Sequence, residues 1–243
     1  MKSVQLNQTL GSLYNQIYSV STRVLIQQAL ASYYTSSNSS TDMQFGPGYN
    51  DFATAIGTQS TLLAGRVYDN DFNQLPNFTV STVTYDFPES LYPTAIPPTP
   101  PGGTNTSAGE ILGPLAISES PGLYVISMTV PITNLNSSAQ PLILGYLSMI
   151  TTATGLLRAV NDSTGMGQTG QTLLVGRNGS QYQILLPPLR TPQFFGQVFN
   201  ISVNPAVEAT FQNQTGYLIN THNAVGTAVS VGYTVIHIHT FHI

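Results

Sequence analysis

The sequence predicts an α+β fold, in which one long N-terminal helix precedes two strand-rich units. Two observations predict it. Apolar residues near the N-terminus recur every three or four positions, whereas from Arg66 onwards the apolar period changes to two. The chain has 243 residues and 41% hydrophobic content. It is therefore long enough for one large domain or two packed modules, because domains typically contain ~100 to 150 residues.

The helical stripe predicts a helix over about residues 4–34, and it consists of Leu10, Leu13, Ile17, Val20 and Val24. Such a stripe either packs against the core of its own chain or forms the coiled-coil seam of a homodimer, and the pattern leaves both alternatives open. A Ser-rich run over residues 35–41 ends this helix. A second, short helix is expected over residues 50–63, after Gly46-Pro47-Gly48.

Runs rich in Val, Ile, Thr, Tyr and Phe predict strands over residues 66–75, 79–85, 123–130 and 142–150. Residues 93–103 contain five prolines and two glycines, so we expect a surface excursion there. A short helix over 152–160 follows, then a glycine-containing loop over 161–170. Asn178-Gly179 predicts a hairpin between 172–175 and 182–186, and two further strands are expected over 216–221 and 224–238.

The composition excludes several classes of function. Only 7% of the residues are charged, against a usual ~25%. A net charge of -4 with six basic residues excludes a nucleic-acid surface, which needs a Lys/Arg patch to neutralise phosphates. The chain has no cysteine, so it is neither a disulfide scaffold nor a thiolate enzyme.

Acceptor sequences for N-glycosylation are unusually frequent. The high Ser and Thr content produces some of them by chance, but their number and even spread predict a chain that passes through the secretory pathway and faces the outside of the cell. The predicted glycosylation sites are Asn7, Asn38, Asn77, Asn105, Asn136, Asn161, Asn178, Asn200 and Asn213.

The sequence contains no apolar run of the ~18 to 20 residues that a membrane span needs. Met1-Lys2-Ser3 is followed by a polar stretch instead of the apolar region of a signal peptide. We therefore expect the chain to be a piece of a larger protein that is held at the membrane by spans outside this sequence.

Three consecutive motifs resemble the strand, helix and hairpin of double Cache sensor domains: Gly145-Tyr146-Leu147-Ser148-Met149-Ile150, Leu156-Leu157-Arg158-Ala159-Val160-Asn161, and Gly167-Gln168-Thr169-Gly170-Gln171-Thr172-Leu173-Leu174-Val175. In that family a long N-terminal helix leads into a membrane-distal PAS-like module, and a second PAS-like module follows near the membrane. The resemblance implies an N-terminal helix over 1–38, a distal module with linker helix over 39–160, and a proximal module over 161–243.

Two upstream motifs resemble more narrowly the ectodomain of fungal hybrid histidine kinases of the SLN osmosensor type: Leu112-Gly113-Pro114-Leu115-Ala116-Ile117 and Ser127-Met128-Thr129-Val130-Pro131-Ile132. The resemblance covers most of the chain and is sharpest over residues 112–186. It implies an extracellular sensor that relays an osmotic or turgor stimulus to an intracellular phosphorelay. The kinase domains would lie outside this chain, which would have no catalysis and no cofactor of its own.

The chain departs from the family pattern in two ways. Cache domains that bind amino acids carry a Trp in the distal module, and this chain has no Trp, so an amino-acid ligand is not implied. The end of the chain, residues 234–243, is His-rich where the family has its last proximal strand, so the proximal module is expected to be truncated or altered there.

The resemblance places a ligand pocket in the distal module, and the candidate ligand-binding residues are Arg66, Tyr68, Asp69, Tyr85 and Tyr124. A guanidinium can hold an anionic ligand through two hydrogen bonds, but it can equally form a structural ion pair with Asp69 or Asp86. Strand alternation puts Arg66 and Tyr68 on one face, opposite Asp69. The expected ligand is a small molecule or a cell-wall component.

The sequence gives little support for a metal site, a serine hydrolase or a glycoside hydrolase. His237 and His239 share one face of an expected strand near His242, but no carboxylate lies close in sequence, so no metal site is predicted. His222 lies in an expected turn, and no Gly-X-Ser-X-Gly motif supports a serine hydrolase. The ten acidic residues could supply a carboxylate pair for glycoside hydrolysis, such as Glu110 with Glu119 or Asp69 with Asp71, but Asp69-Asn70-Asp71 is also an ordinary polar strand edge or turn.

Two alternative functions remain open at this stage: a secreted, glycosylated acid hydrolase and a structural glycoprotein of the cell wall. Low charge and frequent glycosylation sites suit both of them as well as a sensor.

Overall fold

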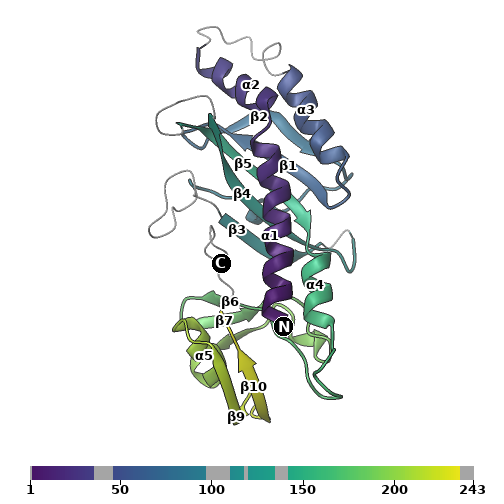
Figure 1. Cartoon of the computed structure of the whole chain (residues 1–243), viewed down its shortest axis with the longest axis vertical. Helices are drawn as coiled ribbons and strands as arrows, with labels where there is room; N and C mark the ends of the chain where they lie inside the picture. Colours follow the sequence, from purple (N-terminus) through teal and green to yellow (C-terminus); the bar gives the residue numbers. More distant parts are fainter. Residues whose placement is uncertain (1, 36–45, 97–109, 118–119, 135–141, 236–243) are drawn as a thin grey trace. The chain divides into compact units, whose positions relative to one another are not determined.

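The computed structural model describes residues 2–35, 46–96, 110–117, 120–134 and 142–235 (Figure 1). The chain divides into two compact units. We call residues 11–153 the sheet unit and residues 2–10 with 154–235 the terminal unit, in both cases as far as the structure describes them. Helix α1 (Lys2–Ser21) contributes to both units.

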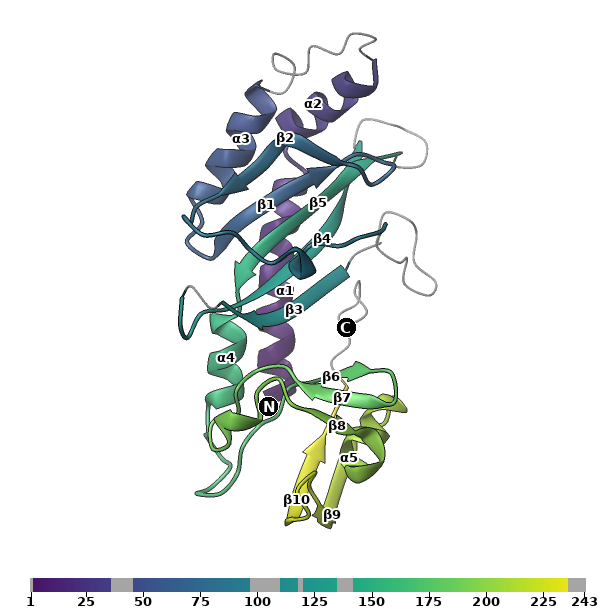
Figure 2. The ribbon, with the colours of Figure 1, turned by 180° about the vertical axis from the view of Figure 1, so that it is seen from behind.

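The sheet unit is built on an antiparallel five-stranded sheet with the order β2-β1-β5-β4-β3 (Figure 2). The two long strands in it are eleven residues each and almost completely buried, as expected for strands covered on both faces. The strands are β1 (Leu62–Tyr68), β2 (Gln74–Ser81), β3 (Glu110–Ala116), β4 (Tyr124–Asn134) and β5 (Leu142–Thr152).

Three helices lie on one face of this sheet, namely the second half of α1, α2 (Val24–Thr35) and α3 (Gly46–Gly57) (Figures 1 and 2). Phe52 of α3 is fully buried and approaches the sheet so closely that a Cβ on Gly65 would lie 2.7 Å from its ring. Gly65 therefore faces the helices. Its strand neighbours Ala64 and Arg66 face the other way, because successive side chains of a strand alternate.

The described part of the connection between β2 and β3, residues 82–96, packs on that opposite face, which we call the loop face. It contains the 3₁₀ helix η1 (Glu89–Leu91). Its apolar residues join those of the sheet in one cluster that consists of Ala64, Phe87, Leu91, Tyr92, Ile117, Val125 and Ile150. The loop face is thus partly covered by a segment that comes from the same chain as the sheet.

The predicted N-terminal helix is interrupted at Thr22 and Arg23, so α1 and α2 are separate helices. The hydroxyls of Ser19, Ser21 and Thr22 each donate to the carbonyl three residues earlier, which competes with regular helical bonding. Arg23 forms an ion pair with Asp51 of α3. The stripe residues Leu10, Leu13, Ile17 and Val20 are buried within the single chain, whereas Val24 is exposed.

The terminal unit contains a three-stranded sheet of order β6-β7-β8 and a separate hairpin of β9 and β10. Its small core centres on Tyr182, Ile184 and Val207. The elements are α4 (Thr154–Asn161), β6 (Val175–Asn178), β7 (Gln181–Ile184), η3 (Pro192–Phe194), β8 (Val198–Asn200), η4 (Ile201–Val203), α5 (Pro205–Phe211), β9 (Gly216–His222) and β10 (Ala228–Tyr233).

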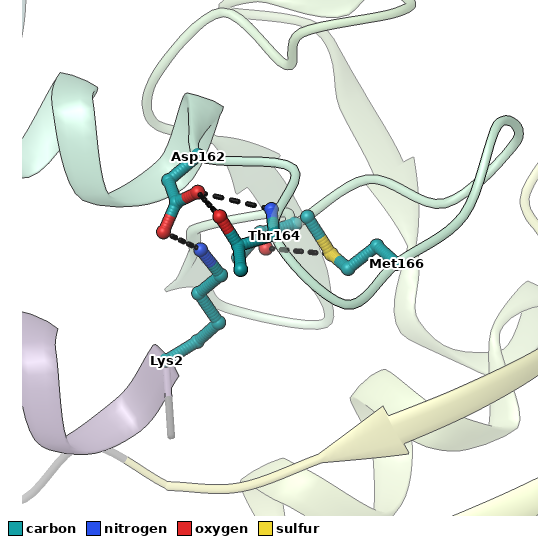
Figure 3. A network of polar contacts seen from close by, with 5 residues as sticks. Lys2, Asp162, Thr164 and Met166 are labelled. Atoms are coloured by element: carbon teal, nitrogen blue, oxygen red, sulfur yellow. Dashed lines mark hydrogen bonds and ion pairs between the residues drawn. The ribbon is translucent and has the colours of Figure 1, made fainter.

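A polar network ties the start of α1 to the end of α4 within the terminal unit (Figure 3). Lys2 forms an ion pair with Asp162, whose other oxygen accepts hydrogen bonds from the Thr164 backbone (2.9 Å) and hydroxyl (2.6 Å). These donors, Lys2 first, hold the pKa of Asp162 well below its ordinary value. The loop after α4 is thereby ordered around one carboxylate.

The predicted α+β class, with a long N-terminal helix and antiparallel sheets, is confirmed. The hairpin at Asn178-Gly179 is also present, with Gly179 in the left-handed conformation that its turn requires. The single strand predicted over 66–75 is wrong, because the chain turns at residues 69–73 between β1 and β2. Strands β3 and β8 and helix α5 had not been predicted.

Among the described residues, we find no helix with both the length and the apolar character required to cross a bilayer.

Candidate functional site

The loop face of the sheet carries one row of side chains that is polar across all five strands. Successive strand partners define it: Thr79 pairs with Arg66, Arg66 with Ser148, Ser148 with Thr129, and Thr129 with Glu110. Paired residues of an antiparallel sheet project to the same side. We call Thr79, Arg66, Ser148, Thr129 and Glu110 the polar row.

The centre of the polar row is buried. Ser148 is 0% and Thr129 1% exposed. The Ser148 hydroxyl lies 3.1 Å from the hydroxyl of Ser127, which belongs to the next row of the same face. Burying hydroxyls in place of Val or Ile opposes folding unless they are hydrogen-bonded, and the contact between Ser127 and Ser148 supplies such a bond for two of the three.

Arg66 is the cation of the polar row and is held by Glu89 of η1. It donates from Nη1 to Oε2 (2.8 Å) and from Nη2 to Oε1 (2.7 Å). The hydrogen bond to Glu89 raises the pKa of Arg66 and lowers that of Glu89. The side chain of Arg66 is 15% exposed and that of Glu89 77%. A deeply placed cation is thus paired with a carboxylate that approaches it from the solvent.

Two tyrosines flank this ion pair. The Arg66 guanidinium lies 3.5 Å from the ring centroid of Tyr92, a cation–π arrangement. Burial raises the pKa of Tyr92 to about 12. Burial also raises the pKa of Tyr68, while the nearby Arg66 lowers it. Within the described part of the chain, Arg66 Nε is buried without a hydrogen-bond partner. The guanidinium therefore retains one unused donor.

Glu110 lies at the other end of the polar row, on the edge strand β3. Burial raises the pKa of its carboxyl group, which favours the neutral acid. Three strand spacings separate it from Arg66, or about 14 Å. Towards one end of the row lies Arg66, whose charge is balanced by Glu89. Hydroxyl groups occupy the middle, and the other end is Glu110, whose carboxyl group has a raised pKa.

The structure brings two of the five predicted ligand-binding residues together, Arg66 and Tyr68. The alternative of an ion pair for Arg66 holds, but the partner is Glu89, not Asp69 or Asp86. Asp69 shapes the turn between β1 and β2: its Oδ1 accepts hydrogen bonds from the backbone of Asp71 (3.0 Å) and Asn73 (2.7 Å).

The two other predicted residues lie outside the polar row. Tyr85 is half-buried and makes an edge contact with Phe87, with ring centroids 5.4 Å apart, at the margin of the apolar cluster. Tyr124 precedes Val125, a member of the loop-face cluster, so by alternation Tyr124 is directed to the helix-covered face. Arg66 and Tyr124 thus belong to opposite faces of the sheet.

Glu110 had been considered only for a hydrolase, and the residues of the site that were not predicted are Thr79, Glu89, Tyr92, Thr129 and Ser148. Ser148 and Thr129 stand inside two of the five motifs that carry the resemblance, so hydroxyls within otherwise apolar strands were the available signal. Glu89 lies 23 residues from Arg66 in an irregular segment, and no spacing rule connects the two.

The chemistry weighed for other functions finds little support. No group of three His, Cys, Asp or Glu side chains suited to a metal ion occurs in the described part of the chain. His237, His239 and His242 lie outside the described residues, as does Glu119. His222 is the last residue of β9 and does not occupy the turn. Of the pair Asp69 and Asp71, the first is engaged by the backbone of its own turn.

The predicted glycosylation sites differ in their surroundings. Asn7, Asn178, Asn200 and Asn213 are exposed, while Asn161 is half-buried. Asn77 lies in β2, and its side chain is not described. Three further sites lie outside the described residues, namely Asn38, Asn105 and Asn136.

The chain is similar to the osmosensing histidine protein kinase SLN1 of Saccharomyces cerevisiae, with 27% identity over 252 residues. The match covers 96% of this chain and 20% of the kinase, so the chain spans about a fifth of the length of that relative. The resemblance to SLN-type osmosensing kinases is confirmed at the level of sequence.

Among solved structures, the chain is similar to the ligand-binding domain of PctC, an amino-acid chemoreceptor of Pseudomonas aeruginosa PAO1, in complex with GABA. The TM-score is 0.43 at 11% identity, and the match covers 84% of this chain and 76% of that domain. No protein-family model matches the chain.

Proposed function

We propose that the chain is the extracellular sensing domain of a membrane-anchored fungal histidine kinase and that it binds a small ligand along the polar row. The observation that carries the proposal is the row itself, polar on all five strands with buried hydroxyls at its centre. The similarity to an osmosensing kinase along nearly the whole chain supports the sensory role.

The proposed ligand is uncharged and rich in hydroxyl groups. The charge of Arg66 is balanced by Glu89, and burial favours the neutral form of Glu110. A charged ligand would therefore meet no net opposite charge at the row. Hydroxyls of Ser148 and Thr129 can both donate and accept, as can those of a polyol, a sugar or a cell-wall oligosaccharide.

Ligand entry would move η1. Glu89 and Tyr92 lie directly on Arg66, and the side chain of Leu91 between them is buried in the apolar cluster. A ligand hydroxyl that accepts a hydrogen bond from Arg66 would compete with Glu89, which is easily released because it is mostly exposed. The segment that contains η1 would then have one arrangement with ligand and another without it, and a sensor requires two such states.

The remaining elements of the proposal follow the family resemblance. The limits 1–38, 39–160 and 161–243 would mark the N-terminal helix, a distal module and a proximal module. The kinase domains would lie outside this chain, which itself would not be an enzyme. An osmotic or turgor stimulus would bias the module or dimer arrangement, with the N-terminal helix as the proposed homodimer contact, and membrane spans outside this sequence would carry the signal inward.

The test is a thermal-shift and calorimetric screen of the complete chain with polyols, sugars and wall oligosaccharides, with small carboxylates for comparison. We expect a neutral hydroxyl-rich compound to raise the Tm and the carboxylates not to do so. Thr129→Val should abolish the shift, because it replaces one row hydroxyl by a methyl group of similar volume. Glu89→Ala should strengthen binding, because the competing carboxylate is gone.

The matched control is Thr151→Val. Thr151 is also a buried strand threonine, but it pairs with Ile126 on the helix-covered face and donates to the carbonyl of Thr61. This variant should keep the ligand-induced shift whatever its own stability. Equal loss in both variants, or a complete absence of hits with neutral compounds, would contradict a ligand site at the polar row.

A further inference from the structure

The three-stranded sheet of the terminal unit has two edge strands, and each of them carries a glycosylation sequence. The order β6-β7-β8 leaves β6 and β8 at the edges, with no further strand beside either within the described part of the chain. Asn178 is the last residue of β6 and Asn200 the last of β8. We propose that N-glycans on Asn178 and Asn200 cap these edges and prevent the sheet from pairing with a second copy.

The register places both asparagines on one outward face. Asn178 pairs with Gln181, and Gln181 pairs with Asn200, so the three side chains form one row. The neighbouring row contains Tyr182, which is buried and stacks on Phe199 with ring centroids 5.5 Å apart. The asparagine row must therefore face solvent. Two strand spacings separate the proposed attachment points, or about 10 Å.

The side chains leave the attachment atoms available. Oδ1 of Asn200 accepts hydrogen bonds from the backbone nitrogen (3.1 Å) and the hydroxyl (3.0 Å) of Ser202. This directs its amide nitrogen away from the chain, and no hydrogen bond to the amide nitrogen of Asn200 or Asn178 is present among the described residues. Asn161 is different, since its Oδ1 is buried without a partner and the next residue is the ion-paired Asp162.

Both edge strands are short, with four residues in β6 and three in β8, which already limits pairing, but neither contains a proline and their pairing with β7 has no bulge. Strand β8 is Val198-Phe199-Asn200, with Val198 exposed on the same outward face as Asn200. The one charged residue of β6, Arg177, is directed to the other face, where it lies over Phe211. A glycan at each edge would add a steric barrier to the one that short strands already give.

The inference rests on the proposed extracellular location. The experiment is expression of the complete chain in a secretory eukaryotic host, with site occupancy measured by peptide mass spectrometry. We expect glycans at Asn178 and Asn200 and none at Asn161. Occupancy of Asn7 or Asn213 with Asn178 and Asn200 empty would overturn this inference alone, whereas a secreted chain without any glycan would also remove a main support of the extracellular location.

The capping role is tested with Asn178→Gln/Asn200→Gln, which removes both acceptor sites. We expect this variant to self-associate with concentration in light scattering, at protein concentrations where the wild type is unchanged. Asn7→Gln/Asn213→Gln, which removes the same number of acceptor sites, should behave like the wild type. Trimming the folded wild-type protein with an endoglycosidase that leaves one sugar per site avoids any folding defect. An unchanged mass for both the variant and the trimmed protein would overturn the capping role.

Discussion

The two units of the chain use strands in opposite ways. In the sheet unit, β4 and β5 are eleven residues long and buried over nearly their whole length, yet they carry hydroxyls at their centre. In the terminal unit the strands have three to seven residues, and apolar side chains such as Tyr217 (74% exposed) and Ile219 (66%) reach solvent. The larger unit can tolerate a buried polar row because apolar side chains pack tightly on the other face of its sheet. The smaller unit buries less apolar surface and therefore has less stability to offset such a cost.

The largest expected effect separates the two units. Phe52→Ala removes a fully buried ring that contacts Gly65 and stacks on Phe78, and it should lower the free energy of unfolding by about 3 to 5 kcal/mol. Hydrogen exchange followed by mass spectrometry should show lost protection in β1, β2 and α3. Equal loss of protection in β6 to β8 would show that the two units do not unfold separately.

Alkali should weaken the sheet unit through its buried tyrosines. Burial raises the pKa of Tyr34 and of Tyr92 to about 12, both above the ordinary 10.0. Because the folded pKa is the higher one, the stabilising contribution is complete below pH 10 and is lost as pH rises towards 12. For the well-buried Tyr92 this amounts to about 2 kcal/mol. Ultraviolet titration of tyrosinate, alongside circular dichroism, should give coincident transitions, and Tyr92→Phe should shift the midpoint upwards.

Arg66→Ala should lower the free energy of unfolding by about 1 to 2 kcal/mol, since it removes the ion pair and the contact with Tyr92. Glu89→Gln should have a smaller effect because its carboxylate is mostly exposed. Arg177→Ala is the counterpart in the terminal unit, where the guanidinium lies 5.7 Å from the Phe211 ring. Urea unfolding of the three variants measures the free energies of unfolding. A larger loss of stability in the Arg177 variant than in the Arg66 variant would contradict the expected order.

The smallest expected effect is a loss of stability of the terminal unit at acid pH. The pKa of Asp162 lies well below its ordinary value of 3.8, so its contribution is present above that pH and disappears as pH falls further. Asp162→Asn should abolish this acid dependence. The measurement is hydrogen exchange of the first turn of α1 and of residues 162–164 between about pH 4 and about pH 2, corrected for intrinsic rates. An identical pH response in wild type and variant would rule out the Lys2–Asp162 pair as its source.

Much of the fold could be predicted because runs rich in β-branched and aromatic residues mark β4 and β5 and a three-and-four spacing marks α1. Strand β3 was missed because Gly113-Pro114 interrupts its alternation. The turn between β1 and β2 was missed for a different reason. It contains Phe72 in a left-handed conformation, which an aromatic residue rarely adopts, with its ring stacked on Tyr68 at 4.5 Å between centroids.

The candidate site was less predictable than the fold. Alternation within β1 correctly put Arg66 and Tyr68 on one face, since this requires only one strand. The polar row requires the register of four strand pairs, and the sequence contains no signal that sets Ser148 opposite Arg66. The Glu89 partner depends on how an irregular connection folds back. Individual side chains could therefore be proposed, but not their neighbours.

Helix α1 has a consequence for how the chain melts. Its buried residues Leu6 and Leu10 are counted with the terminal unit, and Leu13, Ile17 and Val20 with the sheet unit. One run of backbone hydrogen bonds links them, and a helix frays at its ends more readily than it opens in the middle. Unfolding of either unit would therefore remove part of the packing of this one helix. A ligand that stabilises the sheet unit should slow amide exchange at Leu10 as well, although Leu10 is assigned to the other unit.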